Sequence, residues 1–424
     1  MDLLEKITSL AKRRGFIYPS SDIYGGIAGF YDFGPLGVEM KFNIKQAWWH
    51  DVVRSRDDVV GLNASIVMNP KVWEASGHVG GFSDPLVECK KCHHRFKADQ
   101  LETNRCQDCG GELTDKKQFN LMFKTNIGPA EETSAAAYLR PETAQGIFVN
   151  FKNVVDTMRV KIPFGIAQIG KAFRNEINPK DYIFRTREFE QMEVEYFVRP
   201  GEDEKAFKIW VKDREKWYKS IGLKNIRLTE QKKEDRAHYS KATTDIEYKF
   251  PFGWQEIEGI ANRGDFDLRA HIKASGKDLS YLDEEAKEKI VPYVIEPSAG
   301  VDRILLALLC DAYEEDGDRV VLKLSPKIAP YKAAVFPLLA NKPQLTKLAD
   351  KIYHDLKKDL AIAWDARGNI GKRYYSQDEI GTPYCITVDF DSLEKDDVTV
   401  RDRDTTKQKR VKIKELKDYL NGKF

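Results

Sequence analysis

The stretch that decides the fold runs from residue 159 to residue 199, RVKIPFGIAQIGKAFRNEINPKDYIFRTREFEQMEVEYFVR. Apolar and polar residues alternate in both halves, and the turn-forming sequence Asn178-Pro179-Lys180-Asp181 lies between them. Alternation with a period of two, interrupted by Asn, Pro and Asp, is typical of two strands joined by a turn. We therefore predict a long hairpin.

Polar side chains gather on one face of this predicted hairpin. Because side chains two residues apart share a face of a strand, Arg174 and Glu176 point the same way on the first strand, and Phe189 and Glu193 share a face of the second. Unpaired buried charge costs several kcal/mol. A face that mixes arginines, carboxylates and an aromatic ring therefore predicts a ligand site, with a solvated face held by salt bridges as the alternative.

A further cation stands at the start of a distant helix. Arg303 follows the turn Ser298-Ala299-Gly300 and lies in the first turn of an apolar helix predicted from Val301. A positive charge at a helix N-terminus opposes the helix dipole. Because the cation is placed there at an electrostatic cost, its position favours a role in binding an anion.

The composition excludes several classes of protein. Of 424 residues, 69 are Lys or Arg and 67 are Asp or Glu, so the net charge of +2 does not drive the whole molecule onto nucleic acid. With 42% hydrophobic and 32% charged residues, the chain is expected to be globular. The longest apolar run, Ile304 to Cys310, is far shorter than the ~20 residues of a membrane span. Residues 1–6 lack a secretory pattern, so we expect a cytoplasmic protein with no membrane partner.

Four of the six cysteines form two closely spaced pairs. They are Cys89, Cys92, Cys106 and Cys109. Two Cys-x-x-Cys turns can place four thiolates at the corners of a tetrahedron, the geometry that zinc prefers. The spacing predicts a structural zinc site in a small ribbon-like insertion, with a redox dithiol and unligated thiols as the alternatives.

The pattern of elements predicts two domains. Two prolines within residues 325–330 mark a boundary. Residues 1–325 are predicted to form a mixed, mainly antiparallel sheet with helices, interrupted by a zinc-ribbon-like insertion at 85–115 and a helical insertion at 200–245. In residues 326–424 strands alternate with helices, which predicts a small α/β domain.

The C-terminal part also carries seven basic residues in a short span. They are Arg401, Arg403, Lys407, Lys409, Arg410, Lys412 and Lys414. Such a cluster is sufficient for contacts with nucleic-acid phosphates, and a solvated, charged pair of strands is the alternative.

Three segments together resemble the signature motifs of class II aminoacyl-tRNA synthetases. Residues 173–176 (FRNE) and 185–189 (RTREF) look like the second motif, and residues 298–303 (SAGVDR) look like the third. Residues 38–70 fit the looser first motif, a long helix and a strand at a dimer interface. The resemblance implies an α/β (α+β) fold, in which a catalytic domain built on an antiparallel sheet with helices precedes an α/β anticodon-binding domain.

Within that class the chain is similar, over nearly its whole length, to the homodimeric glycyl-tRNA synthetase family. The similar segments are residues 73–85 (WEASGHVGGFSDP), 140–148 (RPETAQGIF), 296–303 (EPSAGVDR) and 372–384 (KRYYSQDEIGTPY). The last of these resembles the anticodon-binding domain of the family. The four-cysteine insertion is not a universal feature of that family, so the zinc prediction rests on the cysteine spacing alone.

The resemblance assigns residues of this chain to an ATP site. By motif position, it implies that Arg174 holds the amino-acid carboxylate together with the α-phosphate, that Glu176 accepts from the adenine amino group, and that Arg185 binds the γ-phosphate. Phe189 and the Arg303 guanidinium would stack on opposite faces of the adenine. Of these residues, Arg174, Glu176 and Arg303 are expected to be catalytic.

The resemblance also assigns acidic residues. In the strand predicted over residues 245–259, Glu256 and Glu258 share a face with Trp254. Glu256 matches the family carboxylate that binds magnesium, whose charge neutralises that of the triphosphate. Glycine offers an ammonium and a carboxylate but no side chain, so its pocket should combine acidic groups with walls that exclude a β-carbon. Glu193, Glu296 and Ser298 suit such a pocket, and Glu142 could belong to the same group.

The implied activity is that of a glycine–tRNA ligase. Glycine and ATP would form glycyl-adenylate and pyrophosphate, and the glycine would then be transferred to the 3′-terminal adenosine of tRNA(Gly). The implied partners are glycine, ATP, magnesium, tRNA(Gly) and a second copy of the chain. The alternatives are a class II synthetase for another small amino acid (threonine, serine or alanine) and a non-catalytic tRNA-binding paralogue.

Overall fold

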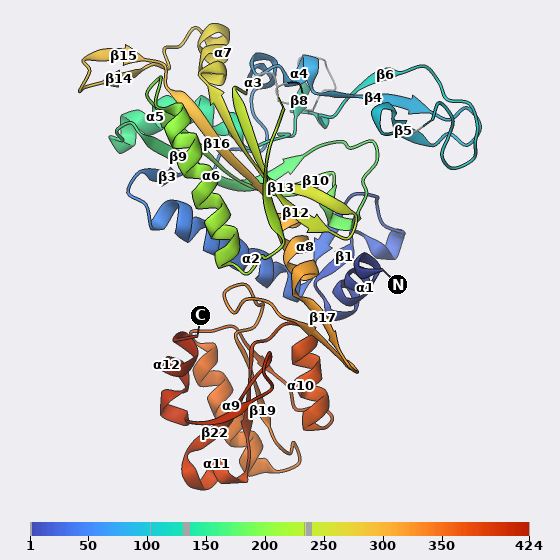
Figure 1. Cartoon of the computed structure of the whole chain (residues 1–424), viewed down its shortest axis with the longest axis vertical. Coiled ribbons are helices and arrows are strands. Elements are labelled where there is room, and N and C mark those ends of the chain that lie inside the picture. Colours follow the sequence, from blue (N-terminus) through green and yellow to red (C-terminus); the bar gives the residue numbers. More distant parts are fainter. Residues whose placement is uncertain (1, 102, 130–135, 233, 235–239, 424) are drawn as a thin grey trace.

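The computed structural model describes residues 2–101, 103–129, 136–232, 234 and 240–423. Figure 1 shows a larger part, which contains the N-terminus and a long twisted sheet, and a smaller part, orange to red, which contains the C-terminus. Helices pack on mixed sheets in both parts, which confirms the predicted α/β (α+β) class. No helix in the described ranges is both long enough and apolar enough to cross a membrane.

A seven-stranded sheet forms the centre of the larger part. Its strands are β3 (Val59–Gly61), β9 (Phe164–Phe173), β10 (Glu188–Val198), β11 (Ile226–Glu230), β12 (Ala242–Phe250), β13 (Gly253–Gly264) and β16 (Tyr293–Gly300). They lie in the order β11-β12-β13-β16-β10-β9-β3, and neighbours are antiparallel except β3, which runs parallel to β9. The predicted hairpin is the β9–β10 pair, in which Glu193 lies opposite Gln168.

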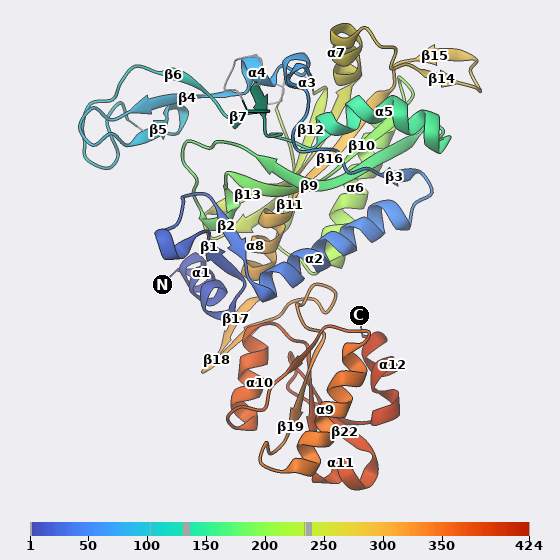
Figure 2. The same ribbon diagram turned by 180° about the vertical axis from the view of Figure 1, so that it is seen from behind.

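Helices cover both faces of this sheet. They are α2 (Pro35–Trp49), α5 (Ala144–Met158), α6 (Asp203–Ser220), α7 (Phe266–Ser275) and α8 (Val301–Ala312). Helices α2 and α5 lie on different sides of the sheet (Figure 2). Because successive side chains of a strand point to opposite faces, Val194 of β10 joins the core with α2, α6 and α8, whereas Phe197 joins a second core with α5 and α7.

The smaller part has its own sheet and its own core. Its strands are β19 (Ala333–Pro337), β20 (Ile362–Trp364), β21 (Tyr384–Val388), β22 (Asp397–Asp402) and β23 (Gln408–Lys412), and its helices are α9 (Pro343–Lys357), α10 (Ile370–Glu379), α11 (Phe390–Lys395) and α12 (Leu416–Asn421). Strand β19 runs parallel to β20 and β21, and the pairs β21–β22 and β22–β23 are antiparallel. The core of this sheet is a separate cluster from the cores of the larger part.

The two segments expected to be insertions differ in structure. The cysteine-bearing segment forms a three-stranded sheet of β4 (Ser83–Glu88), β5 (Arg95–Lys97) and β6 (Lys117–Asn120), which projects sideways in Figure 1. Residues 200–245 are helical only in their first half, because after α6 they form β11 and the start of β12. These two strands complete one edge of the central sheet.

Shorter elements frame the larger part. They are α1 (Leu3–Arg14), β1 (Ile17–Pro19), β2 (Tyr31–Phe33), α3 (Pro70–Ala75), α4 (His78–Gly81), β7 (Lys124–Asn126), β8 (Ala136–Tyr138), β14 (Tyr281–Asp283), β15 (Glu288–Ile290), β17 (Tyr313–Asp316) and β18 (Arg319–Leu322). Residues at both ends of helix α1 cap it. Asp2 and Glu5 form a reciprocal capping box, and Gly15 ends the helix in the left-handed region at φ 78°.

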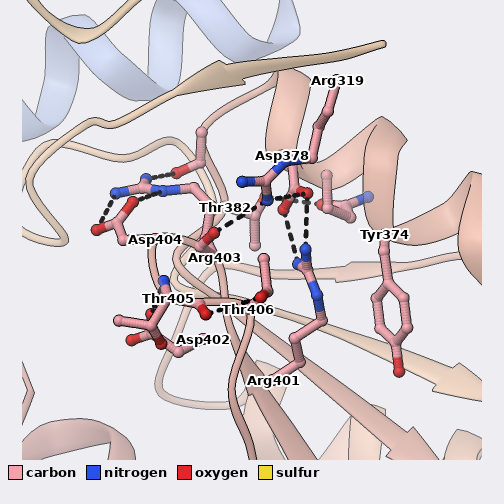
Figure 3. Close-up of polar contacts among 12 residues, drawn as sticks. Arg319, Tyr374, Asp378, Thr382, Arg401, Asp402, Arg403, Asp404, Thr405 and Thr406 are labelled. Atoms are coloured by element: carbon pink, nitrogen blue, oxygen red, sulfur yellow. Dashed lines mark hydrogen bonds and ion pairs between the residues drawn. The ribbon is translucent and has the colours of Figure 1, made fainter. Parts of the chain in front are cut away.

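A buried ionic cluster joins the two parts (Figure 3). Asp378 of α10 is fully buried and accepts hydrogen bonds from Arg401 at 2.8 and 3.0 Å and from Arg319 of β18 at 3.0 Å. Arg403 donates to the backbone carbonyl of Leu324 at 2.9 Å. Arg319 and Leu324 precede the proposed boundary, so the cluster ties the C-terminal sheet to the end of the larger part.

This cluster corrects the prediction for two of the basic residues. Arg401 and Arg403 are buried, at 5% and 2% exposure, so they cannot reach nucleic-acid phosphates. Arg410 is held by Asp389 at 2.6 Å and by Asp397. Sequence spacing could not show this, because the partners come from α10, from the N-cap of α11 and from the start of β22. The four lysines of the same span are exposed and stay candidates: Lys407, Lys409, Lys412 and Lys414.

Replacing Asp378 with Asn is expected to lower the free energy of unfolding of the C-terminal part by about 3 kcal/mol or more. The Arg401 guanidinium would then stay buried without its counter-charge, and Arg319 would keep only the exposed carboxylate of Asp316. Urea denaturation of the full chain measures the loss. The control is Asp391→Asn, which removes one side of the exposed Lys395–Asp391 pair of α11 and should cost less than ~1 kcal/mol. Equal losses in the two variants would contradict the structural role of the cluster.

Candidate active site

One large cavity lies beside β10, β13 and β16, and its volume is about 910 Å³. Ten residues predicted to bind ATP, glycine or magnesium all line it. They are Glu142, Arg174, Glu176, Arg185, Phe189, Glu193, Glu256, Glu296, Ser298 and Arg303. The structure therefore brings together side chains from the β9–β10 hairpin, the start of α8 and two neighbouring strands.

The anion-binding end of the cavity begins where β9 stops. The strand ends at Phe173, so Arg174 and Glu176 lie in the connecting loop and not within the strand, as the alternation had predicted. The Arg174 Nε donates to the backbone carbonyl of Pro141 at 3.0 Å, and its guanidinium carbon lies 5.3 Å from the centre of the Phe189 ring. These two contacts hold a positive charge beside an aromatic surface.

Arg303 enters the same cavity from the first turn of α8. Its Nη1 donates to the backbone carbonyl of Glu256 at 3.0 Å and lies 3.4 Å from Glu256 Oε2. Its guanidinium carbon is 4.4 Å from the centre of the Phe184 ring. A guanidinium stacked on an aromatic ring has a defined orientation. Sequence reasoning missed Phe184, whose one signal was its place directly before Arg185.

Glu193 forms the floor of the acidic end. It is 1% exposed and accepts hydrogen bonds from Thr143 Oγ1 and from Ser298 Oγ, the latter at 2.7 Å. The strand register explains the second contact, since Glu193 and Ser298 lie directly opposite each other in β10 and β16. Burial, and then the charge of Glu142, raise the pKa of Glu193 above its ordinary value.

Glu296 lies two residues before Ser298, on the same face of β16. It accepts a hydrogen bond of 2.6 Å from Arg263 of β13. Arg263 also forms a bidentate pair with Asp267 of α7, at 2.7 and 2.8 Å. Sequence reasoning missed Arg263, because Glu296 lies on a different strand and the i,i+4 spacing to Asp267 does not by itself indicate a site. Arg263 sets the position of the Glu296 carboxylate.

Glu142 completes the acidic end. His78 Nε2 lies 3.4 Å from Glu142 Oε2, and Gln145 Nε2 donates to Glu142 Oε1 at 3.0 Å. Burial alone would raise the pKa of Glu142, but His78 and then Arg263 outweigh burial and hold that pKa below its ordinary range. His78 was not predicted as a site residue, although it lies within the quoted segment 73–85.

Two carboxylates converge above Gly259, next to Arg303. A Cβ atom placed on Gly259 would lie 3.6 Å from Glu256 Oε1 and 3.7 Å from Asp245 Oδ1. Asp245 Oδ1 is buried without a hydrogen-bond partner among the residues that the structure describes. Burial, and then the Glu256 charge, raise the pKa of Asp245 to about 6. Carboxylate oxygens are the ligands that Mg²⁺ prefers, so this donor set fits a magnesium ion.

One predicted face is wrong in this region. Glu258 was expected to share a strand face with Glu256. The pairing of β12 with β13 shifts between Ile246 and Glu247, so Ile257 is an extra residue in β13. Such a bulge breaks the alternation. Glu258 faces α6 and pairs there with buried Arg214 at 2.7 Å.

The four cysteines form a second candidate site at one end of the β4–β5–β6 sheet. Their Sγ atoms lie within 4.8 Å of one another, with 3.5 Å between Cys89 and Cys109 and 3.6 Å between Cys92 and Cys106. A tetrahedral zinc with Zn–S bonds of about 2.3 Å separates its sulfurs by about 3.8 Å, so the donor set fits zinc. The backbone N–H groups of Cys92 and Lys91 lower the pKa of the Cys89 thiol to about 6, which favours the thiolate.

Comparison with known families agrees with this architecture. Residues 123–312 match the family described as "tRNA synthetase class II core domain (G, H, P, S and T)", and residues 332–423 match the "Anticodon binding domain". The antiparallel sheet, its cavity and the C-terminal sheet are thus those of a class II tRNA synthetase.

Relatives that align over the full length of the chain identify the family within this class. The glycine–tRNA ligase of Alkaliphilus oremlandii is 52% identical over 457 aligned positions, which cover 99% of this chain and 98% of that protein. The glycine–tRNA ligase of Ruminiclostridium cellulolyticum is 53% identical, and the alignment covers 99% of this chain and 98% of that protein. The glycine–tRNA ligase of Streptomyces coelicolor is 52% identical, and the alignment covers 100% of this chain and 99% of that protein. The chain belongs to the glycine–tRNA ligase family.

Replacing Glu142 with Gln is expected to lower the free energy of unfolding at pH 7 by about 2 kcal/mol, the worth of a buried hydrogen bond to a charged group. Because the folded protein holds the Glu142 pKa below 4.5, the carboxylate contributes stability above pH 4.5, and this contribution is lost as the pH falls through the lower, folded-state value. The difference between variant and parent should therefore shrink in acid. Chemical denaturation at several pH values measures it, and a difference that grows in acid would contradict the sign.

Proposed function

We propose that this chain is a glycine–tRNA ligase, which activates glycine with ATP and transfers it to the 3′-terminal adenosine of tRNA(Gly). One observation carries the proposal: a single cavity presents guanidinium groups at one end and buried carboxylates at the other. The first end suits a nucleotide triphosphate and a carboxylate, and the second suits an ammonium. Membership of the glycine–tRNA ligase family supports the same substrates.

At the anion-binding end, positioning and charge neutralisation supply the catalysis. Arg174 holds the glycine carboxylate against the α-phosphate, and Arg185 binds the γ-phosphate. The adenine lies between Phe189 and Arg303, and its amino group donates to Glu176. Glu256, beside Asp245, would hold the magnesium ion, which when bound neutralises negative charge on the triphosphate.

At the acidic end, the ammonium group is bound by carboxylates. Glu142, Glu193 and Glu296 surround this end with Ser298, and each carboxylate is already oriented by a neighbouring donor. A substrate with a side chain has to fit its β-carbon among these fixed groups. Exclusion of larger amino acids by steric clash explains how the site can select glycine without a separate editing domain.

Other parts of the chain support the second step. We assign residues 1–325 to the catalytic domain and 326–424 to the anticodon-binding domain. The C-terminal sheet has a core of its own, while Ile328, Ala329 and Ile380 pack in the core of the larger part. The second copy in a homodimer is proposed from the family resemblance and from the exposed apolar residues Val38 and Phe42 on α2. Charging of tRNA also implies a cytoplasmic location.

Pyrophosphate exchange tests the activity. With glycine, alanine, serine and threonine supplied separately, exchange with glycine is expected to exceed the others by about a hundredfold, because an added β-carbon clashes with the pocket. Faster exchange with another amino acid would make the protein a synthetase for that amino acid. Absence of exchange with all four, with tRNA binding retained, would identify a non-catalytic paralogue.

Arg174→Ala serves as the inactive control in that assay. The variant should keep its fold, as judged by circular dichroism, and lose adenylate formation. An active Arg174→Ala enzyme would overturn the role given to this residue while leaving the amino-acid panel interpretable.

We propose that the four cysteines bind one structural zinc ion, which when bound cross-links the ends of the β4–β5–β6 sheet. Metal analysis of the purified protein is expected to give about one zinc per chain. The double variant Cys89→Ser and Cys106→Ser should lose the metal. Cys310→Ala, which removes a buried thiol of α8 outside the cluster, should retain it. A zinc-to-chain ratio near zero with reduced cysteines would refute the proposal.

A further inference from the structure

Glu195 is a buried acid that the proposed mechanism leaves without a role. It lies on β10, two residues beyond Glu193 on the same face of the strand, and it is fully buried. Within the described part of the chain, neither of its carboxylate oxygens has a hydrogen-bond partner. Every acidic residue beside it has at least one donor, so Glu195 is the exception that calls for an explanation.

Its surroundings place it between the acidic pocket and an apolar core. One oxygen each of Glu193, Glu195 and Glu296 lie within 4.8 Å of one another. The register of β10 with β16 sets Glu195 across from Glu296. The next residue on this face, Phe197, packs on Phe151 with ring centres 4.5 Å apart. Glu195 therefore has carboxylates on one side and hydrocarbon on the other.

The charges around Glu195 come from four elements. Glu193 shares β10, Glu296 lies on β16, Arg263 lies on β13 and Asp267 lies on α7, and these are the groups that influence its ionisation. On the other side, β9 places uncharged Ile166 opposite Glu195. Glu296 and Asp267 both accept hydrogen bonds from Arg263. Three carboxylates and one guanidinium therefore surround Glu195.

An ionised Glu195 would be costly in this place. Burial of a carboxylate without a donor or a counter-charge is so unfavourable that such a group takes up a proton instead. Burial, and then the charge of Glu296, raise the pKa of Glu195 well above its ordinary value. Burial also raises the pKa of Glu193 and, although Arg263 opposes it, that of Glu296. The geometry separates these two from Glu195, because hydroxyl groups donate to Glu193 and Arg263 donates to Glu296, whereas no described group donates to Glu195.

We propose that Glu195 is a positioning residue for glycine. It carries a proton, and its neutral carboxyl group lies between the apolar core and the carboxylates of Glu193 and Glu296. In this arrangement those two carboxylates stay ionised and aimed at the ammonium. The inference rests on the proposed function. It divides the acids of the pocket into those that touch the ammonium and one that stays neutral beneath them. The proton sits on a Glu195 carboxylate oxygen, on the side that faces Glu296.

Kinetics of the full-length enzyme test the positioning role through the KM for glycine. Glu195→Leu, which removes the polar group, is expected to raise that KM about tenfold, equivalent to about 1.4 kcal/mol, with the KM for ATP changed less than about twofold. Glu195→Gln has the shape of the protonated acid and keeps donor groups, so it should recover most of the loss. Glu193→Gln, which alters a group that touches the ammonium, should resemble Glu195→Leu.

The same variants decide against the proposal if they behave otherwise. A Glu195→Gln enzyme as impaired as Glu193→Gln would show that Glu195 is ionised and binds the ammonium itself. A Glu195→Leu enzyme with an unchanged KM for glycine would show that the residue has no positioning role.

Infrared difference spectroscopy measures the proton without reference to activity. At neutral pH, the spectrum of the parent minus that of Glu195→Gln is expected to contain the carbonyl stretch of one protonated carboxyl group. Absence of that band would overturn the proposal even if Glu195→Leu failed to fold. The band is also independent of the proposed function, because it would persist in a protein that showed no exchange with glycine.

Discussion

The antiparallel pairing of β10 with β9 and β16 is the constraint on which the rest of the structure depends. It sends Val194 of β10 into the core beneath α8, and it turns Glu193 towards Ser298 of the next strand. A shift of one residue would exchange these two faces and bury the polar set against α2 and α8. Because the apolar face must be buried, the hydrophobic core fixes the register, and the register assembles the polar pocket.

The electrostatics of the cavity follow from the two ends of this sheet. Arg174 extends from the loop after β9, and Arg303 from the helix that follows β16, so both cations lie where strands stop and solvent can enter. Glu193 and Glu296 lie further along the strands, where water is excluded and each needs a donor of its own. A substrate with a negative end and a positive end is oriented by this gradient before any reaction occurs.

Much of the fold and of the candidate site could be predicted, because the decisive signals are local. Alternation predicted the β9–β10 hairpin, and cysteine spacing predicted the cluster at one end of the β4–β5–β6 sheet. The wrong or missing predictions all concern residues whose position depends on strand pairing or on partners distant in sequence. A bulge in β13 turned Glu258 away from the cavity, and Arg401 found buried partners in α10. Arg263 and His78 escaped notice for the same reason, since each acts through residues distant in sequence.

The amino-acid sequence by itself determined the strands, the helices, their caps and the identity of the chemical groups, since periodicity and local hydrogen bonding act over a few residues. The tertiary structure decided which charges stay buried, which are exposed and which meet across strands. Arg401 and Lys409 belong to the same basic run, yet one lies against Asp378 in the interior and the other faces solvent. Burial changes the cost of a charge by several kcal/mol, and burial is a property of the packed chain.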